Sequence, residues 1–203
     1  MGLCVIEGSG GSDNLEMAKE KWADIQVKYV DKYFNLGNPA GSNTQYRGTF
    51  ACSMDDVLPE NKTLAFAVMI STGCSTSAGG VNVESVTGRN VSVSVGYSYS
   101  NQVTITIRGF YIDSGNSSFE IKSAAHYFDV GNPSGSTQRR FDIECSMDSV
   151  LPLDAVIIGY GFRQFNLSAA TSQLNGIVNR TPTINVGYSY NNQVAFTLIA
   201  YYI

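Results

Sequence analysis

Few residues of this chain have the types and spacing that reaction chemistry requires. The sequence contains one histidine, His126, expected at the end of a strand, and the matching position of an internal repeat holds Lys32. A lone histidine with no cysteine or carboxylate partner nearby is usually structural or lies at the surface. No nucleophile elbow, phosphate-binding loop, dinucleotide fingerprint or Cys-x-x-Cys pair is present. We therefore expect a protein that is not an enzyme and that uses no cofactor.

Adjacent carboxylates at Asp55 and Asp56 could suggest a metal site. The repeat holds Asp148 followed by Ser149, so the second carboxylate is not kept. Aspartate and serine side chains often bond to nearby backbone amides and so stabilise turns. We expect a turn or capping role here and no metal site.

The cysteines give no disulfide pattern. Cys52 and Cys145 occupy the same position in the two copies, and neither has a matched partner inside its own unit, while Cys4 and Cys74 are not repeated. A secreted disulfide scaffold would repeat a pair of cysteines. The sequence therefore predicts buried, reduced thiols that act as small apolar side chains, in a reducing compartment.

An internal repeat organises the elements that would position any site. The stretch Gly-Tyr-Ser-Tyr-Ser-Asn-Gln-Val at 96–103 recurs with one change at 187–194, and both copies then run on to a Tyr-Ile pair. We expect an N-terminal arm or linker at 1–21, a first repeat at 22–112 and a second at 118–203. The arm is either a disordered leader or a segment that docks on a neighbouring subunit.

Apolar residues alternate with polar ones in most segments, which indicates β-strands, and no helical period is sustained. Two near-continuous apolar runs, at 64–70 and 155–160, are expected to be central strands covered on both faces. Segments 91–99 and 103–111 are expected to pair as a hairpin, and so are 182–190 and 194–202, with two-residue turns between them. The predicted fold is all-β: two tandem antiparallel β-sandwich modules, jelly-roll or immunoglobulin-like, after a short N-terminal arm.

Composition excludes some partners. Charged residues make up 15% of the chain, its formal net charge is −4, and the densest basic cluster is the pair Arg139-Arg140. Nucleic-acid binding requires clustered basic side chains, and membrane insertion requires a long apolar run. We expect neither partner.

Tyrosine, serine, asparagine and glycine dominate the expected loops, and binding surfaces often use these residues. The same residues also fill ordinary β-turns, which is the favoured role for any one of them. The candidate ligand-binding residues lie at the two hairpin tips and in the two Gly-Asn-Pro loops: Tyr99, Asn101, Tyr190, Asn192, Asn38 and Asn132.

Parts of each copy resemble a known type of module. The run Leu-Asn-Gly-Ile at 174–177, through Arg-Thr-Pro-Thr at 180–183 to the terminal Ala-Tyr-Tyr-Ile, is similar to the C-terminal half of small β-sandwich modules of phage tail fibres and H-type lectins. Leu151-Pro152 and residues 155–159 resemble their proline-led central strand. Such modules typically trimerise. Tyr111 and Tyr202 stand where that family has a tryptophan, so its sugar-contacting residues are not carried over.

The resemblance, the repeat and the lack of a catalytic constellation lead to one main hypothesis. The chain is expected to be a non-enzymatic structural or receptor-binding virion component, a phage tail or head appendage that acts as a multimer and is assembled in the host cytoplasm. Its expected partners are copies of itself, other virion proteins and a cell-surface glycan. The alternative is a carbohydrate-binding lectin with one site per repeat.

Overall fold

The computed structural model describes residues 26–37, 46–74, 79–97, 102–114, 120–131, 139–167, 170–178, 180–188 and 194–203. Every regular element in these ranges is a β-strand, and all the strand pairs are antiparallel. The prediction of an all-β, antiparallel fold is therefore confirmed. The strands are β1 (Gln26–Gly37), β2 (Tyr46–Ser53), β3 (Phe66–Cys74), β4 (Gly79–Thr87), β5 (Asn90–Tyr97), β6 (Val103–Ser114), β7 (Lys122–Gly131), β8 (Arg139–Glu144), β9 (Ile157–Leu167), β10 (Ala170–Val178), β11 (Thr181–Tyr188) and β12 (Val194–Tyr202).

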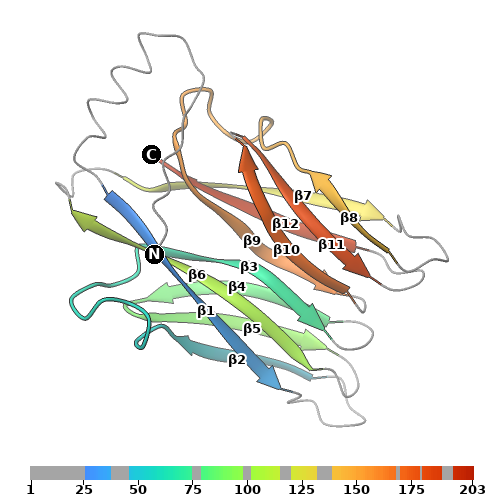
Figure 1. The fold of residues 1–203 in the computed structure, drawn as a ribbon, viewed down its shortest axis with the longest axis horizontal. Coiled ribbons are helices and arrows are strands. Elements are labelled where there is room, and N and C mark those ends of the chain that lie inside the picture. The colour runs from blue at the N-terminus through green and yellow to red at the C-terminus, as the bar shows by residue number, and fades with distance from the viewer. Residues whose placement is uncertain are drawn as a thin grey trace.

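The two repeats pair their strands in the same way. The first forms the rows β1-β6-β3 and β2-β5-β4, and the second forms β7-β12-β9 and β8-β11-β10. Strand β3 also pairs with β10, and β4 pairs with β9. The first repeat (blue to green in Figure 1) therefore joins the second (yellow to red) along these four strands.

The junction between the repeats has approximate twofold symmetry. Met69 pairs with Phe162, and these residues are 93 positions apart (162 − 69), as are Cys52 and Cys145 (145 − 52). Met69 therefore pairs with the residue that occupies its own position in the other repeat. The residue pairs that join β3 to β10 likewise correspond, position by position, to the pairs that join β9 to β4. Residues of one repeat can thus be compared with residues of the other in the same environment.

The prediction that the last two strands of each repeat pair as a hairpin is wrong. Strand β5 pairs with β2 and β4, whereas β6 pairs with β1 and β3, and β11 and β12 are separated in the same way. Alternation identified the buried faces correctly, because Val93 and Ile105 are both in the core. A period of two identifies which face of a strand is buried, but it does not specify which strands pair with that strand.

A two-residue hairpin turn instead connects β4 to β5. Thr87 pairs with Asn90, and the turn residues between them are Gly88 and Arg89. The φ of Gly88 is 61°, in the left-handed region that such turns need and that glycine adopts readily. The turn places the side chain of Arg89 next to the loop that connects β2 to β3.

One large apolar cluster contains residues of all four rows and of both repeats, including Val93, Ile105, Ile184 and Leu198. Strand β3 sends Met69 into this cluster and Val68 into a second, smaller one. The apolar run at 64–70 is therefore buried on both faces over β3, as predicted. Strand β9 likewise contributes to both clusters.

The second cluster packs one repeat against the other. Phe66 of the first repeat stacks on Tyr201 of the second, with their ring centroids 4.1 Å apart. The facing strand β9 has glycines here, and a Cβ atom at Gly161 would lie 2.4 Å from the Cβ of Val68. The predicted boundaries at 22–112 and 118–203 stay predictions, and the expected arm at 1–21 lies outside the described residues.

Candidate functional site

The six predicted ligand contacts lie outside the described residues, so they stay predictions: Tyr99, Asn101, Tyr190, Asn192, Asn38 and Asn132. The chain leading into the two Asn-Pro loops is described. The amide of Gly37 donates to Asn35 Oδ1 and that of Gly131 to Asp129 Oδ1, both at 2.9 Å. Both glycines have a positive φ. The two repeats therefore enter these loops through the same turn.

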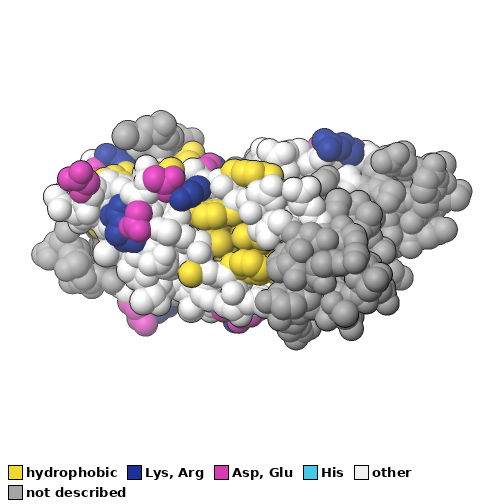
Figure 2. Space-filling view, turned by 90° about the horizontal axis from the view of Figure 1, so that it is seen from below, with side chains coloured by type: hydrophobic (Ala, Val, Ile, Leu, Met, Phe, Trp, Pro, Cys, Tyr) yellow, Lys and Arg dark blue, Asp and Glu magenta, His cyan; other side chains and the backbone are white. Residues whose placement is uncertain are grey.

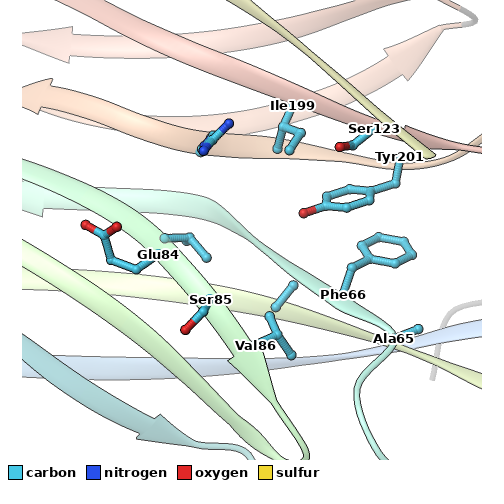
Figure 3. A pocket seen from close by; sticks show the side chains of 11 residues that line it. Ala65, Phe66, Glu84, Ser85, Val86, Ser123, Ile199 and Tyr201 are labelled. Atoms are coloured by element: carbon cyan, nitrogen blue, oxygen red, sulfur yellow. The ribbon is translucent and has the colours of Figure 1, made fainter. Parts of the chain in front are cut away.

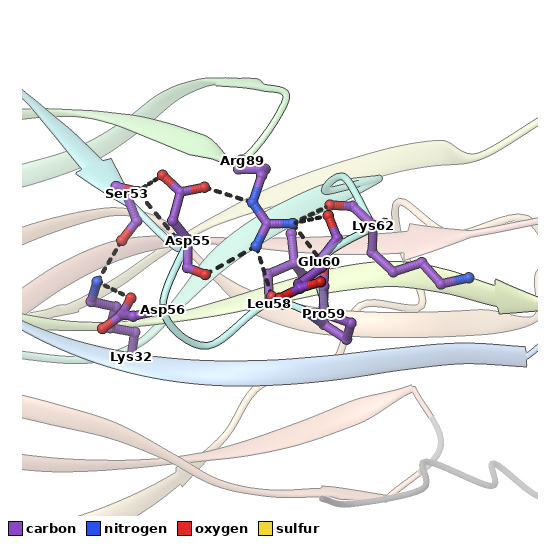
Figure 4. A network of polar contacts seen from close by, with 9 residues as sticks. All are labelled: Lys32, Ser53, Asp55, Asp56, Leu58, Pro59, Glu60, Lys62 and Arg89. Atoms are coloured by element: carbon purple, nitrogen blue, oxygen red, sulfur yellow. Dashed lines mark hydrogen bonds and ion pairs between the residues drawn. The ribbon is translucent and has the colours of Figure 1, made fainter.

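The most connected polar side chain in the described residues is Arg89, which the sequence reasoning missed. Its Nε donates to Asp55 Oδ1 at 2.6 Å. Its two Nη atoms donate to the carbonyls of Leu58, Pro59 and Lys62 at 2.6–2.7 Å, and to that of Asp55 at 3.0 Å. Figure 4 shows these carbonyls surrounding the guanidinium group. Arg89 therefore holds the loop between β2 and β3 in place.

The second repeat has the same arrangement at Arg180. Its Nε donates to Asp148 Oδ1 at 2.5 Å, and its Nη atoms donate to the carbonyls of Pro152 and Leu151 at 2.8 and 2.6 Å. Both aspartates also lie in turns, since the amide of Asp55 donates to Ser53 Oγ at 3.2 Å, and Asp148 has the equivalent bond. The turn role expected for Asp55 is confirmed.

These contacts keep the aspartates ionised. A hydrogen bond from the Ser53 hydroxyl and the ion pair with Arg89 lower the pKa of Asp55. The ion pair with Arg180 and a bond from Ser146 lower the pKa of Asp148. A general acid needs a carboxyl pKa raised towards the working pH. The arrangement at both aspartates therefore suits structural support better than proton transfer.

His126 and Lys32 have matching structural contacts. Lys32 forms an ion pair with Asp56 and donates to the carbonyl of Ser53 at 2.7 Å. His126 Nδ1 lies 2.9 Å from Ser149 Oγ, and its ring stacks on Phe128. His126 lies in the middle of β7, not at a strand end as expected. Both side chains fasten a strand to the loop beside it.

Cys52 and Cys145 are buried and form no disulfide, which confirms the prediction for these two thiols. Burial raises the pKa of Cys52 to about 11 and that of Cys145 to about 12. Since the thiolate is the reactive form, both are inert core side chains at neutral pH. Across the described ranges, no three His, Cys, Asp or Glu side chains are grouped so that they could hold a metal ion.

One exposed aromatic residue occurs in both repeats. Tyr33 is 61% exposed and its counterpart Tyr127 is 56% exposed, although each precedes a phenylalanine that packs against the core. Tyr33 lies beside Thr106 on β6, and Tyr127 lies beside Thr197 on β12. The repeated Tyr-Phe pair is visible in the sequence, but the sequence reasoning did not identify its tyrosine as a surface residue.

A groove of about 280 Å³ lies where the two repeats meet. Its lining combines apolar side chains with the polar groups of Glu84, Ser85, Ser123, Arg163 and Tyr201. Burial raises the pKa of the Tyr201 hydroxyl. In Figure 3 the hydroxyls of Tyr201 and Ser123 point towards the open middle of the groove. The sequence reasoning did not identify any of these residues.

On the face drawn in Figure 2, basic and acidic side chains stand next to one another, and a patch of apolar side chains lies near the middle. Most described basic side chains form ion pairs: Lys28, Lys32, Lys62, Arg89, Arg108, Lys122 and Arg180. Positive charge on these residues is therefore locally neutralised.

No helix in the described parts of the chain is long and apolar enough to span a membrane. Comparisons with models of protein families, with curated proteins and with solved structures found no match to this chain.

Proposed function

We propose that the protein is a non-enzymatic structural or receptor-binding component of a virion, a phage tail or head appendage, and that it acts as a multimer. Its partners are copies of itself and other virion proteins, with which it assembles in the host cytoplasm. The observation that carries the proposal is the pair of equivalent, exposed tyrosines, Tyr33 and Tyr127. Each lies on a strand that has one pairing partner among the described strands.

The arrangement of the strands supports a role in assembly. Strands β1 and β7 present a backbone edge on which another chain can pair, and the tyrosines lie beside that edge. Tyrosine is enriched at protein interfaces because its ring contributes a large apolar area and its hydroxyl a hydrogen bond. A neighbouring subunit could therefore bind at two related places on this chain.

The proposal includes a finer description of the fold. Each repeat is one antiparallel sandwich module with a jelly-roll-like strand order, in which β1-β6-β3 and β2-β5-β4 cover the two sides of a shared core. The shared apolar cluster supports this description, because it takes residues from both rows of each repeat. The arm at 1–21 would then bind a neighbouring subunit.

The mass of the purified chain in solution tests the proposal. Multi-angle light scattering should give a multimer, and Tyr33→Ser with Tyr127→Ser should lower its mass. Leu153→Ser is the matched control, because Leu153 is also a large apolar side chain, is 98% exposed and lies outside the strands. A wild-type chain that stays monomeric at high concentration would refute the assembly role.

A second candidate, a lectin with one site per repeat, is favoured by the surroundings of the same tyrosines. Thr106 lies beside Tyr33 and shares a 2.7 Å hydrogen bond with Ser71 on the next strand. Thr197 lies beside Tyr127, with Gln164 on the next strand. An exposed ring flanked by hydroxyl or amide groups suits a sugar. A glycan array should then show binding that Tyr33→Ala and Tyr127→Ala each reduce, and an array without signal would exclude this function.

A further inference from the structure

The groove between the repeats exists because two paired strands separate. Strands β4 and β9 pair from Gly79 and Leu167 to Asn82 and Gln164, and no pair follows. Residues 83–86 of β4 then line one side of the groove, and Arg163 of β9 with residues 199 and 201 of β12 lines the other. The gap is about 280 Å³, just below the range of about 300–1,000 Å³ for drug-sized ligands, which suits a single small ring.

Both charged residues of the groove lie at β-bulges. Glu84 is the extra residue where β4 shifts register against β5, and Arg163 is the extra residue where β9 shifts register against β12. A bulge changes the direction of a side chain, and bulges are common beside functional sites. Two bulges thus place one acidic and one basic residue in the lining of the same groove.

Hydrogen bonds hold the carboxylate of Glu84 in position. Asn82 Nδ2 donates to Glu84 Oε1 at 2.9 Å, and the hydroxyl of Ser94 donates to the same oxygen. A carboxylate has about four acceptor positions. Glu84 therefore keeps acceptor capacity, chiefly on Oε2, for donors of a ligand.

Arg163 is an exposed arginine without an ion pair to a described carboxylate, as is Arg140 on β8. Arg89, Arg108 and Arg180 by contrast each form one. The positive charge of Arg163 acts on the groove, because it opposes the effect of burial on the pKa of Tyr201. A guanidinium group binds a carboxylate through two parallel hydrogen bonds. An anionic group in the groove would therefore find a partner in Arg163.

The repeat provides an internal comparison for both residues. At the equivalent bulges, Asn175 of the second repeat stands in place of Glu84, and Ile70 of the first repeat stands in place of Arg163. The Arg89 contacts, which support the fold, are by contrast repeated at Arg180. A fold of this kind thus does not require Glu84 and Arg163 at its bulges, so these two charges are free to serve a role other than folding.

We propose that this groove binds a carboxylate-bearing sugar, such as a uronic acid residue of a cell-surface polysaccharide. Arg163 binds the carboxylate, Glu84 accepts hydrogen bonds from ring hydroxyls, and the hydroxyls of Ser123 and Tyr201 donate or accept. Apolar wall residues such as Ile199 contact the C–H face of the ring. The inference rests on the receptor-binding role proposed above, and it gives that role one site per chain rather than one per repeat.

Titration of the full chain with D-glucuronate, followed by ligand-observed NMR, tests the inference. D-Glucose, which has the ring without the carboxylate, and acetate, which has the carboxylate without the ring, should each bind more weakly than glucuronate. Arg163→Gln should weaken glucuronate binding at least tenfold, since a hydrogen bond to a charged group contributes about 1.5–3 kcal/mol. Glu84→Ala should also weaken it.

Two variants serve as controls. Arg140→Gln removes an exposed positive charge on β8, and Asn175→Ala alters the counterpart of Glu84; neither should change binding. Acetate that binds as tightly as glucuronate, or an Arg163→Gln chain with wild-type affinity, would overturn the inference. Attachment to cells is measured separately. If the chain binds glucuronate but does not attach to cells, the sugar site in the groove is supported and only the receptor-binding role is refuted.

Discussion

Replacement of Arg89 by alanine should destabilise the protein more than replacement of its counterpart Arg180. Arg89 donates to three partly buried carbonyls, those of Leu58, Pro59 and Lys62, whereas Arg180 donates to one, that of Leu151. Loss of a donor leaves each such carbonyl without that partner, at about 1 kcal/mol each. The exposed aspartate contacts add little, because solvent screens them. The expected losses are about 3 kcal/mol for Arg89→Ala and about 1 kcal/mol for Arg180→Ala.

Urea denaturation followed by circular dichroism would measure both losses. For a chain of this length, about 3 kcal/mol corresponds to a Tm lower by about 6–12 °C. Arg89→Lys keeps the positive charge but lacks the planar fork, so it should recover only part of the loss. Arg140→Ala controls for the removal of an exposed arginine. An Arg89→Ala chain within about 0.5 kcal/mol of wild type, the range of ordinary surface substitutions, would refute the reasoning.

Two further predictions concern packing and pH. Gly161→Ala should cost about 1–3 kcal/mol through overpacking, because a Cβ atom there would lie 2.4 Å from the Cβ of Val68. Val68→Gly, which removes that Cβ, should restore part of this loss in a double-mutant cycle, and additive losses would contradict the contact. The pKa values of Asp55 and Asp148 are lower in the folded chain than the 3.8 of an ordinary aspartate. The stability that their ionised forms contribute is therefore present above pH 3.8 and is lost as the pH falls through the folded pKa values. In denaturation experiments from pH 6 to pH 2, the free energy of unfolding of Asp55→Asn and Asp148→Asn chains should fall less steeply with pH than that of wild type. Asp154→Asn is the control. A pH dependence equal to that of wild type would contradict the role given to these aspartates.

Local sequence patterns were sufficient for the features that depend on one strand. The run at 64–70 is apolar without interruption, and β3 is indeed buried on both faces at Phe66, Val68 and Met69. Cys52 and Cys145 were correctly expected to be buried thiols, because each lies in an apolar strand context with no matched cysteine in its unit. Such inferences need only the alternation of side chains along a strand.

The hairpins and the groove depend on which strands become neighbours, which a single sequence does not specify. The pairing of β4 with β9 joins residues far apart in the chain, and Glu84 and Arg163 come together only through it. A usable signal did exist for the arginine contacts, since Arg89 and Arg180 occupy the same turn position after Gly88 and Asn179. The polar faces suggested binding residues at the loop tips, and that expectation remains open.

The contact between the two repeats makes them unequal partners. Phe66 lies against Gly159, and Val68 lies against Gly161, so at each place a bulky residue meets a glycine at its own equivalent position. Two copies of the first repeat would put bulky side chains into the same volume, and two copies of the second would leave a void. The chain is in effect a heterodimer whose subunits are joined covalently. Like halves therefore do not fit each other, whereas a second half fits a first half.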